Sequence, residues 1–160
     1  ADLGCGNGWV VRLAAQHKQC RQADGFDGAT HMIEKAKAVD SENGYHLAMF
    51  PQTQPSQQYN LIHSMEFIYY LHDPKQMLQS IHDDWLADEG WAVIGIDHYA
   101  ENEESLEWPT ALDVHMSTFS EHEWIEMWND VGFEEVHAWR ANQSPGKPGT
   151  LAIIGKKNQK

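Results

Sequence analysis

The sequence contains few cysteines and no long hydrophobic run. Cys5 and Cys20 are its two cysteines, and they have neither the spacing of a metal site nor the number that a disulfide framework needs. We therefore expect no metal and a reducing cytoplasm. No stretch approaches the roughly 20 apolar residues that cross a bilayer, and no segment has the pattern of a signal peptide. These absences argue against a membrane partner.

Basic residues are also few. Eleven Lys and Arg stand against 24 Asp and Glu, which gives a net charge of −13. This charge argues against nucleic acid or an anionic membrane surface as the main partner. Plain solubility or a saline habitat explains the acidity equally well. The length of 160 residues, with 41% hydrophobic residues, predicts a single domain spanning residues 1–160.

Short apolar runs alternate with amphipathic stretches along the chain, which is typical of an α/β protein with a parallel sheet covered by helices. We expect strands at 1–3, 22–26, 45–49, 59–63 and 91–96, and helices at 9–18, 30–38 and from 74 to Gly90. Asp73 followed by Pro74 is a typical helix start.

The last third of the chain predicts a helix followed by two strands. Ser120 and Glu123 form a capping box, and Gly132 suits the left-handed position that ends a helix. Strands at 133–140 and 150–156 follow. Because their connection is too short for a helical crossover, we expect them to pair antiparallel.

The first residues, ADLGCGNG, indicate a ligand-binding turn between a strand and a helix. Gly4, Gly6 and Gly8 leave the backbone bare, so a ligand can approach it and meet the amides at the helix start. The even spacing, with Trp9 where a third dinucleotide glycine belongs, disfavours a dinucleotide. Asp27 follows the second predicted strand, where a carboxylate can hold a ribose diol. Asp27 with Gly28 is alternatively only a turn.

ADLGCGNG resembles motif I of the class I S-adenosylmethionine-dependent methyltransferases. GFDGATHMIEKAKA resembles their second strand and following helix, residues 59–96 their fourth strand through fifth, and GTLAIIGKK their last strand. The resemblance implies a three-layer Rossmann-like sandwich with a mostly parallel seven-stranded sheet and an antiparallel hairpin strand at its end. It also implies that S-adenosylmethionine is the cofactor, that the first strand is truncated, and that the family's N-terminal segment is missing.

The resemblance also implies roles for individual residues. It places Asp2, Gly4, Cys5 and Gly6 around the methionine part of the cofactor, and Asp27 at the ribose. It places Gly28, Met32, Met49 and Phe50 around the adenine, and Ser64 and Met65 beside the sulfonium. Core packing is an equal alternative for Met32 and Met49. The sequence departs from the family at Gly28, where an apolar residue is usual, and after the third strand, where only Gln52 offers a polar side chain.

Methyl transfer from a sulfonium is an in-line displacement, which requires alignment of the reactants and removal of any acceptor proton. No covalent nucleophile is needed, and none of the usual nucleophile or phosphate-loop motifs is present. The sequence HSMEF stands where enzymes that methylate amino groups of nucleic acids carry N/D-P-P-Y. We therefore expect a small-molecule acceptor, with its acceptor atom and the oligomeric state left open.

Two groups of residues are candidates for the acceptor side. The first is Glu66, Tyr69 and His72. The second lies in residues 97–119, a stretch without obvious structure that we expect to form a lid, and contains His98, Tyr99, Trp108 and His115. Glu66 is a candidate for orienting the substrate, and His98 and His115 are candidate bases. Each of them has an ordinary packing or surface role as its alternative.

Two other functions remain open at this point. One is a non-catalytic module, or a partner subunit, that binds S-adenosylmethionine. The other is a nicotinamide-dependent oxidoreductase, which the glycine spacing disfavours.

Overall fold

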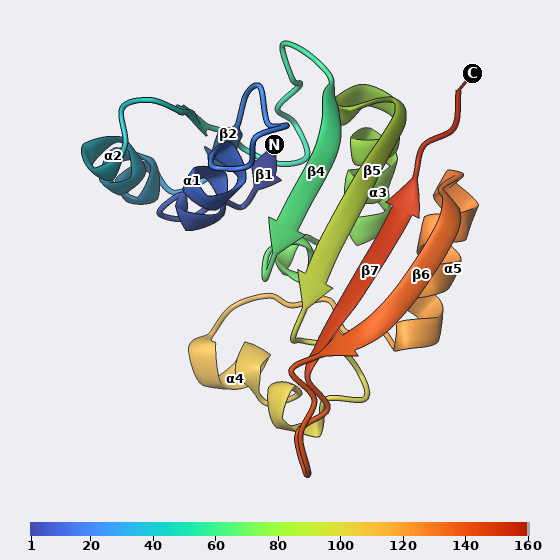
Figure 1. Ribbon diagram of the computed structural model, residues 1–160. Coiled ribbons are helices and arrows are strands. Elements are labelled where there is room, and N and C mark those ends of the chain that lie inside the picture. Colours follow the sequence, from blue (N-terminus) through green and yellow to red (C-terminus); the bar gives the residue numbers. More distant parts are fainter. Residues whose placement is uncertain (160) are drawn as a thin grey trace.

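A seven-stranded sheet with strand order β3-β2-β1-β4-β5-β7-β6 organises the computed structural model, which describes residues 1–159 (Figure 1). Its strands are β1 (Asp2–Leu3), β2 (Asp24–Asp27), β3 (Gly44–Leu47), β4 (Tyr59–Met65), β5 (Leu86–Ile96), β6 (Glu134–Ala141) and β7 (Thr150–Lys156). Strands β1 to β5 pair in parallel, and β7 lies antiparallel between β5 and β6. This topology confirms the predicted α/β fold and its terminal antiparallel hairpin.

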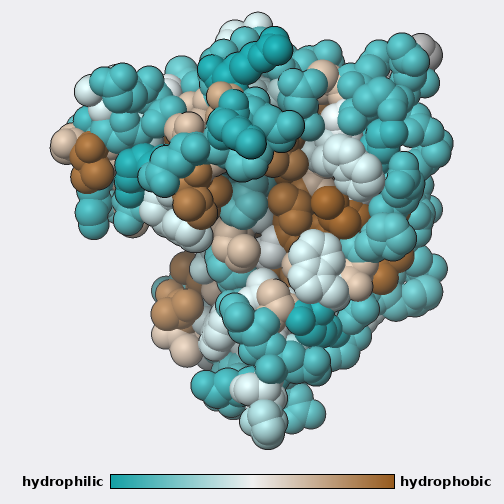
Figure 2. All heavy atoms as spheres, in the orientation of Figure 1, coloured by the Kyte–Doolittle hydropathy of each residue, from teal (hydrophilic) through white to brown (hydrophobic). Residues whose placement is uncertain are grey.

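Residues 1–159 form five α-helices, and the part of the sheet from β4 to β6 has helices on one face only (Figure 1). The five helices are α1 (Trp9–Ala15), α2 (Thr30–Val39), α3 (Pro74–Ser80), α4 (Trp108–Leu112) and α5 (Glu121–Val131). Behind β4, β5, β7 and β6 lie α3 and α5, and the front of these strands carries no helix (Figure 1). Figure 2 shows apolar side chains gathered over this front face. Along residues 1–159, no helix is both long and apolar enough to span a membrane.

Two hydrophobic clusters stabilise the sheet. The larger one contains three fully buried tryptophans, Trp85, Trp124 and Trp128, and lies where α3 and α5 pack. The smaller one joins α1 and α2 to the first strands through residues such as Val11, Ile33 and Tyr45. Each fully buried large side chain contributes on the order of 1.5 to 3 kcal/mol, so the larger cluster anchors the β4–β6 half.

The structure corrects the predicted boundary between α3 and β5. The helix does not continue to Gly90: α3 ends at Ser80, one π-helical turn spans Ile81–Trp85, and β5 begins at Leu86. The pairing of β4 with β5 shifts register there, and Glu89 has a φ of 61° within the bulge. The buried Lys157 donates to the carbonyl oxygens of Asp83 and Leu86 at 3.3 and 2.8 Å. These bonds satisfy carbonyls that a helix end leaves free.

The capping box of α5 is confirmed. Ser120 Oγ accepts from Glu123 N at 3.2 Å, and the Glu123 carboxylate accepts from Ser120 N at 2.7 Å. At the other end, Gly132 has a φ of 105°. Both helix ends are therefore satisfied by local residues, as the sequence predicts.

Replacement of Ser120 by alanine should lower the free energy of unfolding by about 1 kcal/mol, because α5 loses its N-terminal cap. Urea unfolding of the native protein and Ser120→Ala measures the difference. Ser56→Ala, in an exposed loop, serves as the control and should change little. Equal effects of the two substitutions would contradict a stabilising role for the cap.

Candidate functional site

The glycine loop between β1 and α1 adopts a left-handed backbone at all three glycines. The φ angles of Gly4, Gly6 and Gly8 are 76°, 52° and 75°. A Cβ at Gly4 would collide with Phe67, and one at Gly8 with Tyr45, so folding itself requires these two glycines. A Cβ at Gly6 would have no atom within 4 Å. The bare backbone of Gly6 therefore faces open space that a ligand can fill.

The carboxylate of Asp27 fixes this loop from the end of β2. Its Oδ2 accepts a hydrogen bond from Gly6 N, and its Oδ1 accepts one from Ala29 N, both at 2.8 Å. Charge-assisted hydrogen bonds of this kind are stronger than neutral ones. The predicted partner of the glycine loop thus lies beside it at the carboxyl edge of the sheet.

A cavity of about 340 Å³ opens next to the loop, within the range of about 300 to 1,000 Å³ typical of small-ligand sites. It is lined by Asp2, Gly4, Cys5, Gly6, Asn7, Trp9, Val10, Met32, Lys35, His63, Met65 and Glu66. Figure 2 shows the molecule hollowed between the part formed by α1 and α2 and the part that carries α4. The structure thus brings together six of the residues predicted at the cofactor, and Glu66 as well.

The other predicted cofactor residues lie outside this lining. The Ser64 side chain is 1% exposed, and its hydroxyl donates to Leu3 O at 2.8 Å. Phe50 packs against Phe67 and Trp85, with ring centroids 5.1 and 5.7 Å apart. Met49 is exposed, and Gly28 lies near its sulfur. The Ser64 hydroxyl therefore links β4 to β1. The cofactor roles of the residues outside the lining, which are Asp27, Gly28, Met49, Phe50 and Ser64, stay predictions.

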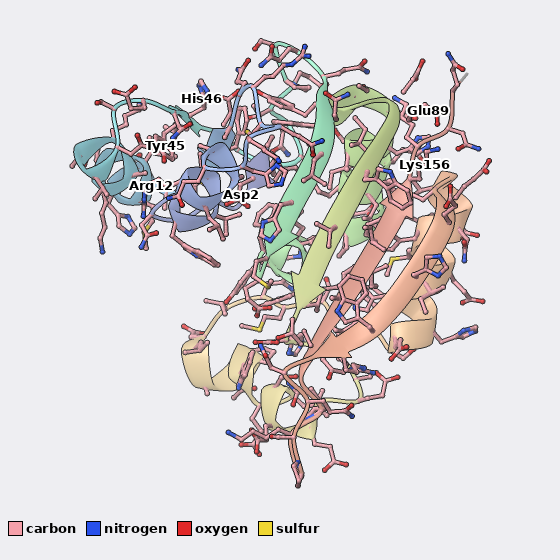
Figure 3. All side chains as sticks on the ribbon, viewed as in Figure 1. Asp2, Arg12, Tyr45, His46, Glu89 and Lys156 are labelled. Carbon is pink, nitrogen blue, oxygen red and sulfur yellow. The ribbon has the colours of Figure 1, made fainter. Side chains whose placement is uncertain are left out.

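A pair formed by Asp2 and His63 was not foreseen from the sequence. Asp2 is buried on β1, and its Oδ1 lies 2.8 Å from His63 Nδ1 on β4 (Asp2 is labelled in Figure 3). The two residues are direct neighbours in the parallel pairing of the strands. The available signal was a histidine directly after the apolar pair Leu61 and Ile62. The pair presents hydrogen-bonding groups to the cavity wall beside the glycines.

Glu66 lies where β4 ends and has a strained backbone, with a φ of 54°. Its Oε2 accepts a hydrogen bond from the Tyr69 hydroxyl at 2.8 Å, while its Oε1 is buried without a partner. Burial raises the pKa of the Glu66 carboxyl from about 4.5 to about 7. Strained backbone and perturbed pKa values are both enriched at functional sites, which singles out Glu66 among the candidates.

His98, one of the two candidate bases, lies outside the cavity lining. His98 is fully buried, and its Nδ1 lies 2.9 Å from Ser105 O while its Nε2 lies 2.7 Å from Thr118 Oγ1. Both ring nitrogens are therefore occupied within residues 97–119. Desolvation also lowers the pKa of His98, so the ring holds this segment together as a neutral group.

His115 is exposed and lies outside the cavity lining. Its ring stacks on that of His72 with centroids 3.9 Å apart, and its Nε2 lies 3.1 Å from Ser117 Oγ. Among residues 1–159, the hydrogen bond and ring contact of His115 and the ring contact of His72 do not involve the glycine loop. The role of His115 as a base therefore has no structural support.

Residues 97–119 form an ordered segment beyond the ends of β4 and β5 (Figure 1), contrary to the expectation of a stretch without structure. They contain a 3-10 turn (Glu103–Ser105) and α4. Ser117 N donates to Tyr69 O at 2.7 Å, and the buried Tyr99 donates from its hydroxyl to Gly149 O at 2.7 Å. None of these residues lines the cavity, so the lid stays a prediction.

Comparison with known proteins identifies the family. The model of the methyltransferase domain family matches residues 2–138. The chain therefore belongs to the methyltransferase domain family, which confirms the predicted class of enzyme. No curated protein matches the sequence.

Solved structures share the fold at low identity. One is a chain of the complex between the Haloferax volcanii Trm112 methyltransferase activator and a methyltransferase, at 23% identity and a TM-score of 0.82 over 99% of this chain and 81% of that one. Another is an S-adenosylmethionine-dependent methyltransferase from Mesorhizobium loti, at 18% identity and 0.81 over 98% and 89%. A third is PigF with SAH, at 15% identity and 0.73 over 98% and 49%.

The raised pKa of Glu66 predicts a pH-dependent stability. The folded state binds the carboxyl proton more tightly than the unfolded state, so stability is lost as the pH rises from about 4.5 through about 7. Glu66→Gln has no carboxyl group to ionise, so this pH-dependent loss does not occur. Its free energy of unfolding should therefore rise by about 2 kcal/mol relative to that of the native protein as the pH goes from about 4.5 to about 7. Urea unfolding at pH 5 and pH 8 measures the gain.

Glu89→Gln is the matched control. Glu89 also has a left-handed backbone, but its ion pair with Lys156 lowers its pKa, and it lies at the opposite end of the sheet from residues 97–119 (Figure 3). The stability that the Glu89 carboxylate contributes is present at high pH and is lost as the pH falls. The pH dependence of Glu89→Gln relative to the native protein should therefore have the opposite sign to that of Glu66→Gln. The same pH trend in both variants would contradict the buried character of Glu66.

Proposed function

We propose that this protein transfers a methyl group from S-adenosylmethionine to a small-molecule acceptor, and does so in the cytoplasm. The observation that carries the proposal is the bare backbone of Gly6, which faces open space at the edge of the cavity while Asp27 holds the loop in shape. Membership of the methyltransferase domain family supports it. So does the fold shared with structures described as S-adenosylmethionine-dependent methyltransferases.

The residues around the cavity fit this cofactor. Asp2 and His63 offer polar groups to an amino acid moiety, while Cys5, Met32 and Met65 offer apolar surface. Burial raises the pKa of the Cys5 thiol to about 12, so this residue acts as a neutral packing group. When bound, S-adenosylmethionine supplies an electrophilic methyl group on a sulfonium.

The role of this chain is to bind, orient and exclude water. In-line displacement needs the acceptor atom aligned with the methyl group, and alignment of this kind accounts for much of enzymatic rate enhancement. Met65, the last residue of β4, and Glu66, directly after it, line the cavity, and we infer that they contact an acceptor next to the glycine loop. The net charge of −13 argues against nucleic acid as that acceptor.

A protein partner is a secondary possibility for this chain. The similar Haloferax volcanii chain occurs in a complex with a methyltransferase activator. A partner of this kind would act together with methyl transfer and would not replace it. Size-exclusion chromatography of the protein isolated under native conditions, with mass spectrometry of any co-eluting chain, tests this possibility.

Gly6→Ala tests the cavity edge. The added methyl group fills space that the cofactor would occupy, so affinity for S-adenosylhomocysteine should fall at least ten-fold in isothermal titration calorimetry. Gly146→Ala is the matched control, because Gly146 also has a positive φ and no atom within 4 Å of an added Cβ. Both variants carry a similar backbone strain of about 1 to 2 kcal/mol, but only Gly6→Ala should lose binding.

The same titration separates the candidate cofactors. Binding of NAD without binding of S-adenosylmethionine or S-adenosylhomocysteine would overturn the proposal. Unchanged affinity in Gly6→Ala would remove the glycine loop from the site.

Asp27→Asn should weaken binding of S-adenosylhomocysteine by about 1 to 3 kcal/mol, because the ribose hydroxyls lose a charged acceptor. Asp88→Asn, an exposed residue of the β5 bulge, provides a control with the same chemical change. Thermal unfolding of each variant verifies folding. A folded Asp27→Asn variant with native affinity would contradict the ribose role.

A further inference from the structure

We propose that Glu66 accepts the proton of the methyl acceptor, and that the acceptor is therefore a weakly basic amine or an acidic hydroxyl compound. This inference rests on the proposed methyl transfer in the same cavity. It assigns a base and a substrate class to the site.

The position of Glu66 is fixed by the backbone. Its N–H donates to Gly95 O at 3.0 Å, which continues the pairing of β4 with β5 one residue past Met65. The left-handed φ of 54° then turns the chain away from the sheet. A glutamate seldom adopts this conformation, and such strain is concentrated at functional sites. Glu66 and Gly6 line the same cavity, so Glu66 lies at the proposed site of the methyl donor.

The two carboxyl oxygens have different surroundings. Oε2 accepts from the hydroxyl of Tyr69, a residue that is 2% exposed and whose carbonyl oxygen accepts from Ser117 N. Oε1 is shielded from water and has no partner of hydrogen-bond geometry, although the main-chain N–H of Asp97 also favours the charged form of the carboxyl. Buried polar atoms without partners are rare. Glu66 lines the cavity, so a small rotation of its side chain would expose Oε1 to an N–H or O–H group of a molecule bound there, which supplies the missing donor.

The ionisable groups around Glu66 leave it available as a base. Tyr69, on the short turn after β4, is a donor whose own pKa is raised by burial, so it stays protonated. The carboxylate of Asp97, after β5, repels the charged form of Glu66. The other ionisable side chains of the cavity are Asp2 with its partner His63, Cys5 and Lys35. No cation pairs with the Glu66 carboxylate among the contacts of residues 1–159.

The proton transfer balances with the group transfer. A lone pair of the acceptor nitrogen or oxygen forms a bond to the methyl carbon. The bond between that carbon and sulfur breaks, and its electron pair stays on sulfur. The proton of the acceptor passes to Oε1, which leaves a neutral Glu66 that returns its proton to water after product release.

The acceptor needs both a free lone pair for the methyl carbon and a proton that Glu66 can accept. Burial raises the pKa of Glu66 to about 7, which suits a general base at neutral pH. An aliphatic ammonium, with a pKa near 10, has no lone pair free at neutral pH and cannot attack the methyl group. Aromatic amines, imidazoles and phenols present a lone pair at neutral pH together with an N–H or O–H proton, and they match the base.

The test measures methyl transfer to phenol, aniline, imidazole and methylamine, in the native protein and in variants. The native protein should methylate one or more of the first three, with kcat rising through about pH 7. Glu66→Gln should lower kcat by about 10²- to 10⁴-fold while binding of S-adenosylhomocysteine changes less than two-fold in calorimetry. Glu89→Gln should retain native kcat.

Two further variants separate a base from a structural residue. Glycine suits the left-handed backbone at this position, and Glu66→Gly leaves the space of the carboxyl group empty. Added formate should therefore raise the kcat of Glu66→Gly at least ten-fold. Tyr69→Phe removes a donor that favours the carboxylate, so the midpoint of the kcat profile should move to higher pH. Infrared difference spectra should show a carboxyl band that titrates near pH 7 in the native protein and is absent from Glu66→Gln.

The possible failures are distinguishable. Absence of S-adenosylmethionine and S-adenosylhomocysteine binding by the native protein would overturn the proposed function. Binding of these compounds with methylation of only methylamine, or of no probe, would overturn the acceptor class. Native kcat in folded Glu66→Gln, or no rescue of Glu66→Gly by formate, would overturn the role of Glu66 as the base.

Discussion

The carboxylate of Asp27 is the contact on which the site depends. It accepts hydrogen bonds from Gly6 N and Ala29 N at once, and so joins the glycine loop after β1 to the turn after β2. The three glycines contribute no side chains, so the loop is held by Asp27 together with bonds such as Gly4 N to Phe26 O at 2.8 Å. Gly4 and Gly8 have positive φ angles, and Phe67 and Tyr45 occupy the space that a side chain at these two positions would need. Of these three glycines, only Gly6 has open space beside it, and Gly6 lines the cavity.

The two halves of the sheet contribute different parts of the site. The β1–β3 half carries the glycine loop and Asp27, and has a small core. The β4–β6 half is anchored by three buried tryptophans and presents Met65 and Glu66 from the end of β4. A rigid β4 explains how Glu66 keeps both a strained backbone and a buried carboxyl oxygen without a partner, since the neighbouring β5 and Tyr69 hold it in place.

Local signals in the sequence predicted the local structure well. The glycine triplet, the capping box of α5 and the short connection before β7 each depend on a few neighbouring residues, and all three appear in the structure. The boundary before β5 was predicted wrongly because it depends on Lys157, more than 70 residues away along the chain, which binds carbonyl oxygens at the end of the π turn.

The candidate site was predictable only in part, for the same reason. Asp27 and the cavity glycines were found because a strand followed by a glycine turn has a known geometry. His63 was missed because its partner Asp2 is 61 residues distant. The sequence left His98 open between a base and a packing residue, because a sequence shows that a residue can titrate but not that both of its ring nitrogens are occupied. The special state of Glu66 arises from burial, which likewise depends on tertiary packing.

The central claim is that the glycine loop and Asp27 bind the cofactor. Titration of the isotope-labelled protein with S-adenosylhomocysteine, followed in two-dimensional amide NMR spectra, tests it most directly. Cofactor binding at this site should produce saturable shifts at the amides of Gly6 and Ala29, which donate to Asp27, and at Met65 and Glu66 across the cavity. Saturable binding that leaves the amides of Gly6 and Ala29 unshifted, or no binding at all, would contradict it.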